Sequence, residues 1–239
     1  MSEADTIYPV PAEFAATANL SPETYKVMYE RSISDPEGFW AEHGKRLDWM
    51  TPYTTAKKTS WEQGDFQIEW YADGVLNVSA NCLDRHLEAR GDKAALIWEG
   101  DSPDESRTLT YRELHAEVCR FANVMKKLGV KKGDRVATLC TPSPDYFICF
   151  LATASIGGVW VGLNPRYQLN ELTYVADDSQ PVMLLARSEI EGRDYTSELE
   201  ALANGTLSIR QTVVLDEQSG RLPEGGIGLE AFLAQGASV

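Results

Sequence analysis

The chain has 239 residues, of which 43% are apolar, 24% charged and 10% aromatic. These fractions are those of an ordinary globular protein and exclude a disordered, collagen-like or disulfide-dense chain. Its 36 acidic and 22 basic residues give a net charge of -14. That charge repels phosphate backbones and anionic lipid, so it argues against nucleic-acid and membrane-surface partners. The acidic N-terminus is unlike a signal peptide, and we expect a cytoplasmic protein.

Two helices are predicted near the N-terminus. Ser21 is a typical N-cap and Pro22 suits the first helical position, which predicts a helix that continues through the stripe of Tyr and Met side chains that follows. Asp35 and Pro36 repeat the same start signal, and this second helix is predicted to stop near Gly44.

The rest of the N-terminal region carries weaker signals. Residues 1–20 are polar and contain prolines, so we expect an extended arm. Residues 48–65 show neither helical nor strand periodicity and are predicted to be irregular. Residues 66–78 alternate like a strand, with Asp73-Gly74 as a turn signal.

From about residue 76 short strands alternate with helices. Strands are predicted at 93–100, 135–140, 158–163, 181–186 and 211–216, and helices at about 77–90, 110–128, 145–157, 169–178 and 189–203, with a charged loop at 101–107. Strands separated by helices favour parallel pairing through right-handed crossovers. We therefore predict an α/β fold with a layered, mostly parallel sheet and flanking helices over residues 76–239, preceded by a helical and extended region over 1–75.

Four residues have a spacing that a zinc site would need. Cys82 and His86 are four residues apart, as are His115 and Cys119, so each pair would share one face of a helix. Two such faces that met could form a tetrahedral site. Spacing within two helices does not bring them together, so we interpret these residues as half-buried positions on amphipathic helices and predict no metal.

Motifs for phosphate or nucleophilic chemistry are missing from the sequence. It contains no GxxxxGK[ST], GxGxxG, GxSxG or HExxH pattern. The glycine-rich run EGGIGLE at 224–230 has no lysine, and we interpret it as a turn. The residues alone therefore predict an acidic α/β protein without a visible catalytic centre.

Three stretches resemble the N-terminal portion of AMP-forming acetyl-CoA synthetases over about residues 20–137. They read ERSISDPEGFWAEHGKRLDWMTPY, IEWYADGVLNVSANCLDRHLEARGDKAALIWEGD and TYRELHAEVCRFANVMKKLGVKKGDRVA. The resemblance implies that residues 1–75 correspond to the N-terminal domain of those enzymes and residues 76–239 to the first part of the AMP-binding α/β domain.

After about residue 138 the resemblance changes. The stretch DYFICFLATASIGGVWVGLNPRYQLNELTYVADDSQP is similar instead to fatty-acyl-CoA ligases of the same adenylate-forming superfamily. All nine lysines lie at or before Lys132, which leaves the last 107 residues without one. Because both changes fall close together, we hypothesise a mosaic chain with a join near residues 133–145.

The resemblance implies a two-step ligase. ATP and a carboxylate such as acetate form an acyl-adenylate, and CoA then displaces AMP, with Mg²⁺ as the metal. The family's Pro-Lys phosphate loop, nucleotide-binding segments and catalytic lysine all correspond to positions beyond residue 239, so no catalytic residue is assigned. An Arg-containing loop that contacts the CoA nucleotide matches RSEIEGRDY, with Gly192 and Arg193 as candidates and Arg187 as a weaker one. The alternative is a surface Arg193 paired with Glu189 or Asp194.

Three functional hypotheses remain open. The chain is the N-terminal segment of an acyl-CoA synthetase that is inactive alone, or a non-catalytic half-domain that docks on a complementary chain or an intact synthetase, or a free-standing enzyme with a degenerate site. The first two predict an exposed apolar surface where the rest of the domain would pack. The third predicts pyrophosphate release by the isolated chain.

Overall fold

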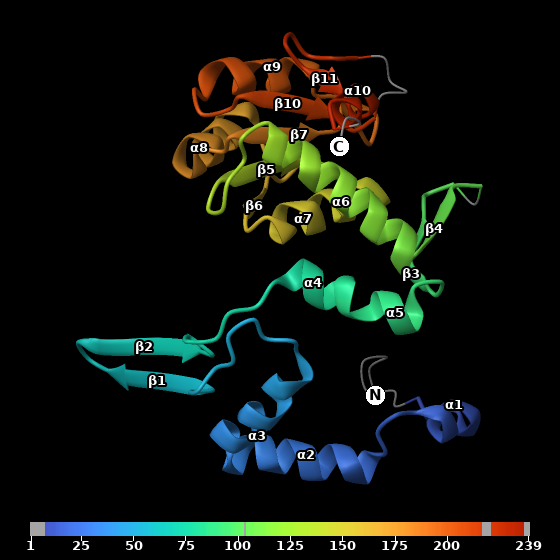
Figure 1. The fold of residues 1–239 in the computed structure, drawn as a ribbon, viewed down its shortest axis with the longest axis vertical. Coiled ribbons are helices and arrows are strands. Elements are labelled where there is room, and N and C mark those ends of the chain that lie inside the picture. Colours follow the sequence, from blue (N-terminus) through green and yellow to red (C-terminus); the bar gives the residue numbers. More distant parts are fainter. Residues whose placement is uncertain (1–7, 103, 217–220, 237–239) are drawn as a thin grey trace, which may run out of the picture. The chain divides into compact units, whose positions relative to one another are not determined.

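The computed structural model describes residues 8–102, 104–216 and 221–236. The chain divides into two compact units, Met1–Leu76 and Asn77–Val239. Figure 1 gives the elements of both in sequence colours.

The first unit begins with three helices, α1 (Ala12–Thr17), α2 (Pro22–Ser34) and α3 (Pro36–His43), followed by the 3-10 turn η2 (Gly44–Arg46). The cap predictions are confirmed: Ser21 Oγ accepts from the Thr24 amide and Asp35 from the Gly38 amide. The expected extended arm is wrong for its second half, because α1 forms there from a short alanine-rich run of high helix propensity. The remainder of that prediction, at residues 1–7, lies outside the described residues.

A hairpin completes the first unit. Strand β1 (Lys57–Glu62) pairs antiparallel with β2 (Asp65–Trp70), and Figure 1 shows the two arrows side by side. The prediction of irregular chain over 48–65 is therefore wrong for β1. Its sequence is polar, but the tight turn at Gly64, with φ +92°, brings it into register with β2. Residues 57–62 therefore form a strand because they pair with β2, and not because of their own sequence pattern.

An aromatic cluster holds this unit together. Tyr71 donates its hydroxyl to the Trp40 carbonyl at 2.7 Å, and the Trp49 indole donates to the Gly44 carbonyl at 2.8 Å. The Trp49 and Tyr53 rings meet edge to face with centroids 4.9 Å apart. Such contacts stabilise a unit that has few fully buried aliphatic side chains.

The second unit opens with a broken helix and another hairpin. The helix predicted over 77–90 forms as three short pieces: α4 (Val78–Cys82), the 3-10 turn η3 (Asp84–His86) and α5 (Leu87–Arg90). The break is at Leu83, which leaves helical geometry (φ -121°, ψ -66°) and buries its side chain. Strand β3 (Ala94–Glu99) is confirmed, but the loop predicted over 101–107 is too long, because β4 (Ser106–Thr110) pairs antiparallel with β3.

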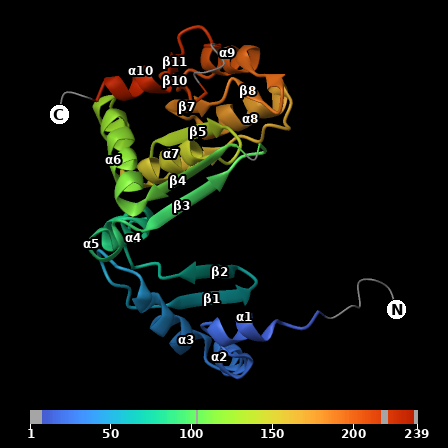
Figure 2. The ribbon, with the colours of Figure 1, turned by 90° about the vertical axis from the view of Figure 1, so that its right-hand side faces the viewer.

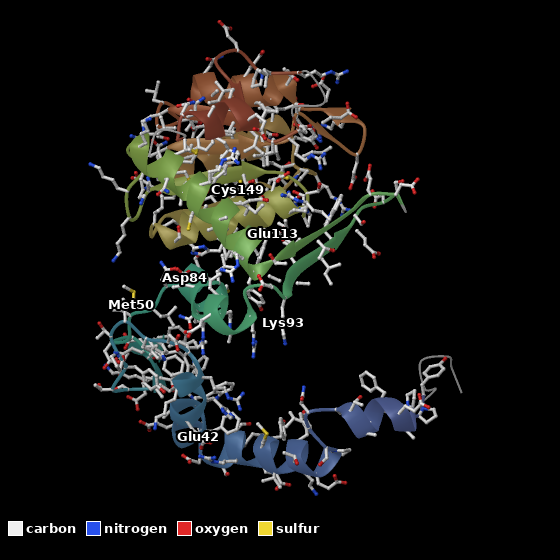
Figure 3. All side chains as sticks on the ribbon, turned by 45° about the vertical axis from the view of Figure 1, so that its right-hand side comes forward. Glu42, Met50, Asp84, Lys93, Glu113 and Cys149 are labelled. Carbon is white, nitrogen blue, oxygen red and sulfur yellow. The ribbon has the colours of Figure 1, made fainter. Side chains whose placement is uncertain are left out.

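Helix α6 (Tyr111–Lys127) carries the strongest local signal in the sequence. Thr110 caps it through a reciprocal capping box with Glu113, as predicted. The helix ends as predicted before Gly129, whose φ of +79° favours glycine. Glu113 is labelled at the start of α6 in Figure 3.

A five-stranded parallel sheet forms the centre of the second unit. Its strands are β5 (Arg135–Leu139), β6 (Val159–Gly162), β7 (Met183–Ala186), β10 (Gln211–Val214) and β11 (Ile227–Gly228). They lie in the order β11-β10-β7-β5-β6, and all four neighbouring pairs are parallel. The connections contain α7 (Pro144–Ser155), α8 (Leu169–Ser179), the hairpin β8 (Glu189–Ile190) with β9 (Arg193–Asp194), and α9 (Thr196–Gly205), and α10 (Leu229–Ala234) follows β11.

Both faces of this sheet are covered, which confirms the predicted α/β layers. Val136 of β5 packs with α6, α7 and α10 on one face, whereas Ala137 packs with α8 and α9 on the other. Figure 2 shows the strands between α6 and α8. Burial on both sides explains why these strands are mostly apolar, and why β7 is apolar throughout. Among the described residues, no helix is both long and apolar enough to cross a membrane.

Candidate functional site

A cavity of about 370 Å³ lies at the carboxyl edge of the parallel sheet. Its walls come from the segments that follow three strands: Thr141 after β5, Asn164 to Arg166 after β6, and Ile190 to Tyr195 after β7. The strand order reverses beside β5: β6 lies on one side of β5, and β7, the next strand of this sheet along the chain, lies on the other. Ligands of open parallel sheets bind outside the carboxyl ends of the strands at such a reversal.

The β8–β9 hairpin brings Arg193 to this cavity. Glu191 and Gly192 form its two-residue turn, with φ values of +51° and +77°, which is the geometry of a tight hairpin that favours glycine. The helix predicted over 189–203 is therefore wrong at its start, and α9 begins only at Thr196. Arg193 lines the cavity, whereas Gly192 sits in the adjoining turn and is not part of the wall.

Arg193 is held by two side chains. Its Nη2 lies 2.6 Å from Glu198 Oε1 on α9, and its guanidinium carbon lies 4.4 Å from the Tyr195 ring centre. The alternative interpretation, an ion-paired Arg193, holds with a different partner: it pairs with Glu198, whereas Glu189 and Asp194 contact Arg221 Nη1, at 3.6 and 3.0 Å. The hydrogen bond to Glu198 raises the pKa of Arg193 above its usual value. Burial raises the pKa of Glu198, but the hydrogen bonds from Arg193 and Ser197 outweigh it and the pKa ends below its usual value.

The charge of the cavity wall differs from that of the whole chain. Arg166 and Arg193 line it with one carboxylate, Glu191, although the chain carries a net charge of -14. A guanidinium fixed against an aromatic ring presents a planar set of donors that suits phosphate or carboxylate groups. The wall therefore carries two guanidinium groups, of which that of Arg193 is already paired with Glu198.

The weaker candidate, Arg187, does not line the cavity. It follows β7 directly, and its amide donates to the Leu139 carbonyl at 3.0 Å. Sequence reasoning missed Arg166, Tyr195 and Glu198. The only local signal for the stacked arginine is the spacing of Arg193, Tyr195 and Glu198, an aromatic residue two positions and a carboxylate five positions after the arginine.

The other candidate motifs have structural roles. His115 and Cys119 do share a face of α6, with Nε2 and Sγ 3.4 Å apart, but the side chain that meets them is Asp84, 3.5 Å from the same nitrogen. Within the described ranges no cluster of three or more His, Cys, Asp or Glu could hold a metal. The EGGIGLE run forms a turn at Gly226, whose amide donates to Pro223, and then the short strand β11.

Two family models match this chain. The AMP-binding enzyme model matches residues 83–228, and the acetyl-coenzyme A synthetase N-terminus model matches residues 25–82. An acetyl-coenzyme A synthetase of Novosphingobium aromaticivorans is 52% identical over 174 residues, which cover 71% of this chain and 27% of that protein. One of Aeromonas hydrophila is 44% identical over 230 residues, or 93% of this chain and 35% of that protein.

A solved structure shares the fold. The acetoacetyl-CoA synthetase of Streptomyces lividans matches with a TM-score of 0.73 at 23% identity, over 93% of this chain and 34% of that one. The chain thus spans about a third or less of the length of the proteins it matches.

Proposed function

We propose that this chain, which belongs to the AMP-binding enzyme family, is the N-terminal segment of a cytoplasmic acyl-CoA synthetase. The proposed enzyme is of the acetate–CoA ligase type. In the proposed reaction ATP and a carboxylate form an acyl-adenylate and pyrophosphate, and the CoA thiol then displaces AMP. The observation that carries this proposal is the pair of adjoining family matches, at 25–82 and 83–228. The similarity to acetyl-coenzyme A synthetases over 71% and 93% of this chain supports the same proposal.

The cavity at the carboxyl edge of the sheet is the proposed contact for the CoA nucleotide. Arg193 supplies the donor, Tyr195 and Glu198 hold its guanidinium in place, and Gly192 allows the tight turn that presents it. Arg166, on the segment after β6, adds a second positive charge to the cavity wall. The phosphates of CoA are the anionic groups that such a wall would bind.

We propose that a polypeptide of residues 1–239 does not catalyse the ligase reaction by itself. Stabilising phosphoryl charge requires donors and Mg²⁺ at fixed positions, and the resemblance assigns those groups to positions beyond residue 239. We expect no pyrophosphate release from residues 1–239 with ATP, Mg²⁺, CoA and acetate, propionate or octanoate. Release with any of these acids would instead support the free-standing enzyme.

An open sheet edge favours a second candidate, in which the chain docks on a complementary polypeptide. β6 is an edge strand of the parallel sheet, and Val159 on it is 46% exposed. Ile97 on the β3–β4 hairpin is 72% exposed. Open edges and exposed apolar side chains are features that partners cover. Co-elution of this chain with the remaining part of an acetyl-CoA synthetase in size-exclusion chromatography, with recovery of ligase activity, would support docking; separate elution would remove it.

The mosaic origin also stays a proposal, with the join near residues 133–145. The proposal rests on the change of resemblance after about residue 138 and on the lack of lysine after Lys132. Sequencing the source DNA across the join, together with the same region in close relatives, tests it. Even similarity to one subfamily along the whole chain would remove the idea.

A further inference from the structure

Half of the cavity wall depends on a carboxylate that lies outside it. Ile190, Glu191, Arg193 and Tyr195 all belong to the segment that leaves β7 and forms the hairpin. The residue that holds the start of this segment is Asp216, which follows β10, the neighbour of β7 in the sheet.

Asp216 uses its two oxygens on two different amides. Oδ1 accepts from the Ser188 amide at 2.8 Å, and Oδ2 accepts from the Glu189 amide at 3.0 Å. The Ser188 hydroxyl donates to the same carboxylate, 3.3 Å from Oδ1 and 3.2 Å from Oδ2. Ser188 is fully buried, so its polar atoms depend on protein partners.

The same serine closes the base of the hairpin. The Ser188 carbonyl accepts from the Tyr195 amide at 2.8 Å. One step along, Glu189 lies opposite Asp194 and Ile190 opposite Arg193 in the antiparallel register. A displacement of the Ser188 and Glu189 backbone would therefore also displace their paired residues on the second strand of the hairpin, and with them Arg193 and the Tyr195 ring.

We propose that Asp216 is a positioning residue that fixes the Arg193 hairpin in its ligand-binding geometry. It acts through Ser188 and Glu189 and not by contact with a ligand. Only a carboxylate meets this requirement at this size, because both of its oxygens accept hydrogen bonds. Asparagine has the same shape but turns one acceptor into a donor, which then faces an amide N–H. The expected effect of Asp216 on CoA affinity rests on the proposed function, whereas its expected effect on the order of the hairpin does not.

Hydrogen exchange on the whole chain tests the positioning directly. For Asp216→Asn we expect amide exchange over residues 188–195 to be at least tenfold faster, with β5 and β7 unchanged. The matched control is Asp177→Asn, which removes the same charge from an exposed α8 carboxylate bonded to the Thr206 hydroxyl at 3.2 Å. It should leave residues 188–195 within twofold of the wild type. Equal exchange in the wild type and Asp216→Asn would overturn the proposal.

A second variant covers the case in which Asp216→Asn does not fold. Ser188→Ala removes the hydroxyl contact and keeps both amide bonds, so we expect about threefold faster exchange confined to 188–195. No rise in this variant would then overturn the proposal.

CoA titration separates positioning from ligand identity. At an unchanged unfolding midpoint, Asp216→Asn should bind CoA about tenfold more weakly than the wild type, and Asp177→Asn should bind it equally well. Faster exchange with undiminished CoA affinity would overturn the positioning role. If the wild type does not bind CoA, the assignment of the cavity fails while the exchange result still decides what Asp216 does.

Discussion

The guanidinium carbon of Arg193 lies 4.4 Å from the centre of the Tyr195 ring. Tyr195 is itself buried, and its hydroxyl donates to the Pro165 carbonyl on the segment after β6. The stacked arginine is therefore connected through Tyr195 to the cavity segment that follows β6. A cation over a fixed ring loses little freedom when it binds a ligand, which lowers the cost of binding.

Replacing Arg193 by Lys should weaken CoA binding about tenfold, equivalent to ~1.4 kcal/mol. Lysine keeps the charge but lacks the planar set of donors that stacks on Tyr195 and pairs with Glu198. Isothermal titration measures the loss. Arg210→Lys is the control, because Arg210 contacts Asp134 at 3.5 Å and does not line the cavity. Equal affinity of Arg193→Lys and the wild type would show that Arg193 does not contact the ligand.

The capping box of α6 should give the unfolding free energy a specific pH dependence. Hydrogen bonds from the Thr110 amide and hydroxyl lower the pKa of Glu113 below its ordinary 4.5. A carboxyl with a lowered folded-state pKa contributes stability that is complete above 4.5 and is lost as the pH falls through the folded-state value.

Urea unfolding of the wild type and Glu113→Gln between pH 3 and 7 measures this contribution. The wild type should be more stable above the ordinary pKa of 4.5, and the difference should shrink as the pH falls further. A difference that stays constant over this range would contradict ionised capping by Glu113.

Removing the Phe232 ring should destabilise the second unit by ~3–5 kcal/mol. Phe232 on α10 is fully buried, with its ring centroid 4.8 Å from that of Phe121 on α6. Urea unfolding of Phe232→Ala measures the cost. Leu207→Ala serves as the control, since Leu207 is 94% exposed and should change stability by less than ~0.5 kcal/mol. A similar small change in Phe232→Ala would mean that α10 is not packed on the core.

The four thiols should separate into two reactivity classes. Cys82 and Cys119 are exposed, whereas Cys140 and Cys149 are buried; Figure 3 labels Cys149 on α7. Burial raises the pKa of Cys140 to about 11 and that of Cys149 well above its usual 9.0, and a thiol reacts as its thiolate. Titration with a disulfide reagent at pH 8 should label only Cys82 and Cys119 in the folded chain, and all four cysteines in urea. Labelling of Cys149 in the folded chain as fast as that of Cys82 would contradict its burial.

The sequence predicts the local part of this fold well. The Thr110–Glu113 capping box and the Ser21 and Asp35 caps are visible because each depends on residues within one helical turn. The doubly covered strands β5 and β7 are visible because burial on both faces leaves a largely apolar run, in which only Arg135 and Thr138 of β5 are polar. By contrast, the polar strands β1 and β4 exist because a neighbouring strand pairs with them, and no residue inside either strand signals that partner.

The candidate site was harder to predict for the same reason. Thr141, Arg166 and Arg193 meet at one cavity because the order of the strands places three separate loops at one sheet edge. The resemblance pointed to Arg193, but its partner Glu198 and its support Tyr195 follow from the hairpin turn and the start of α9. Asp216 lies still further along the chain and has no motif that would connect it to Ser188.

The most direct test is an isothermal titration of CoA into the wild-type chain, with pantetheine, which lacks the nucleotide, as the comparison ligand. We expect saturable binding of CoA and no measurable binding of pantetheine, because Arg193 and Arg166 would contact the phosphorylated nucleotide. Equal heats for the two ligands, or no binding of CoA at millimolar concentration, would contradict the assignment of this cavity.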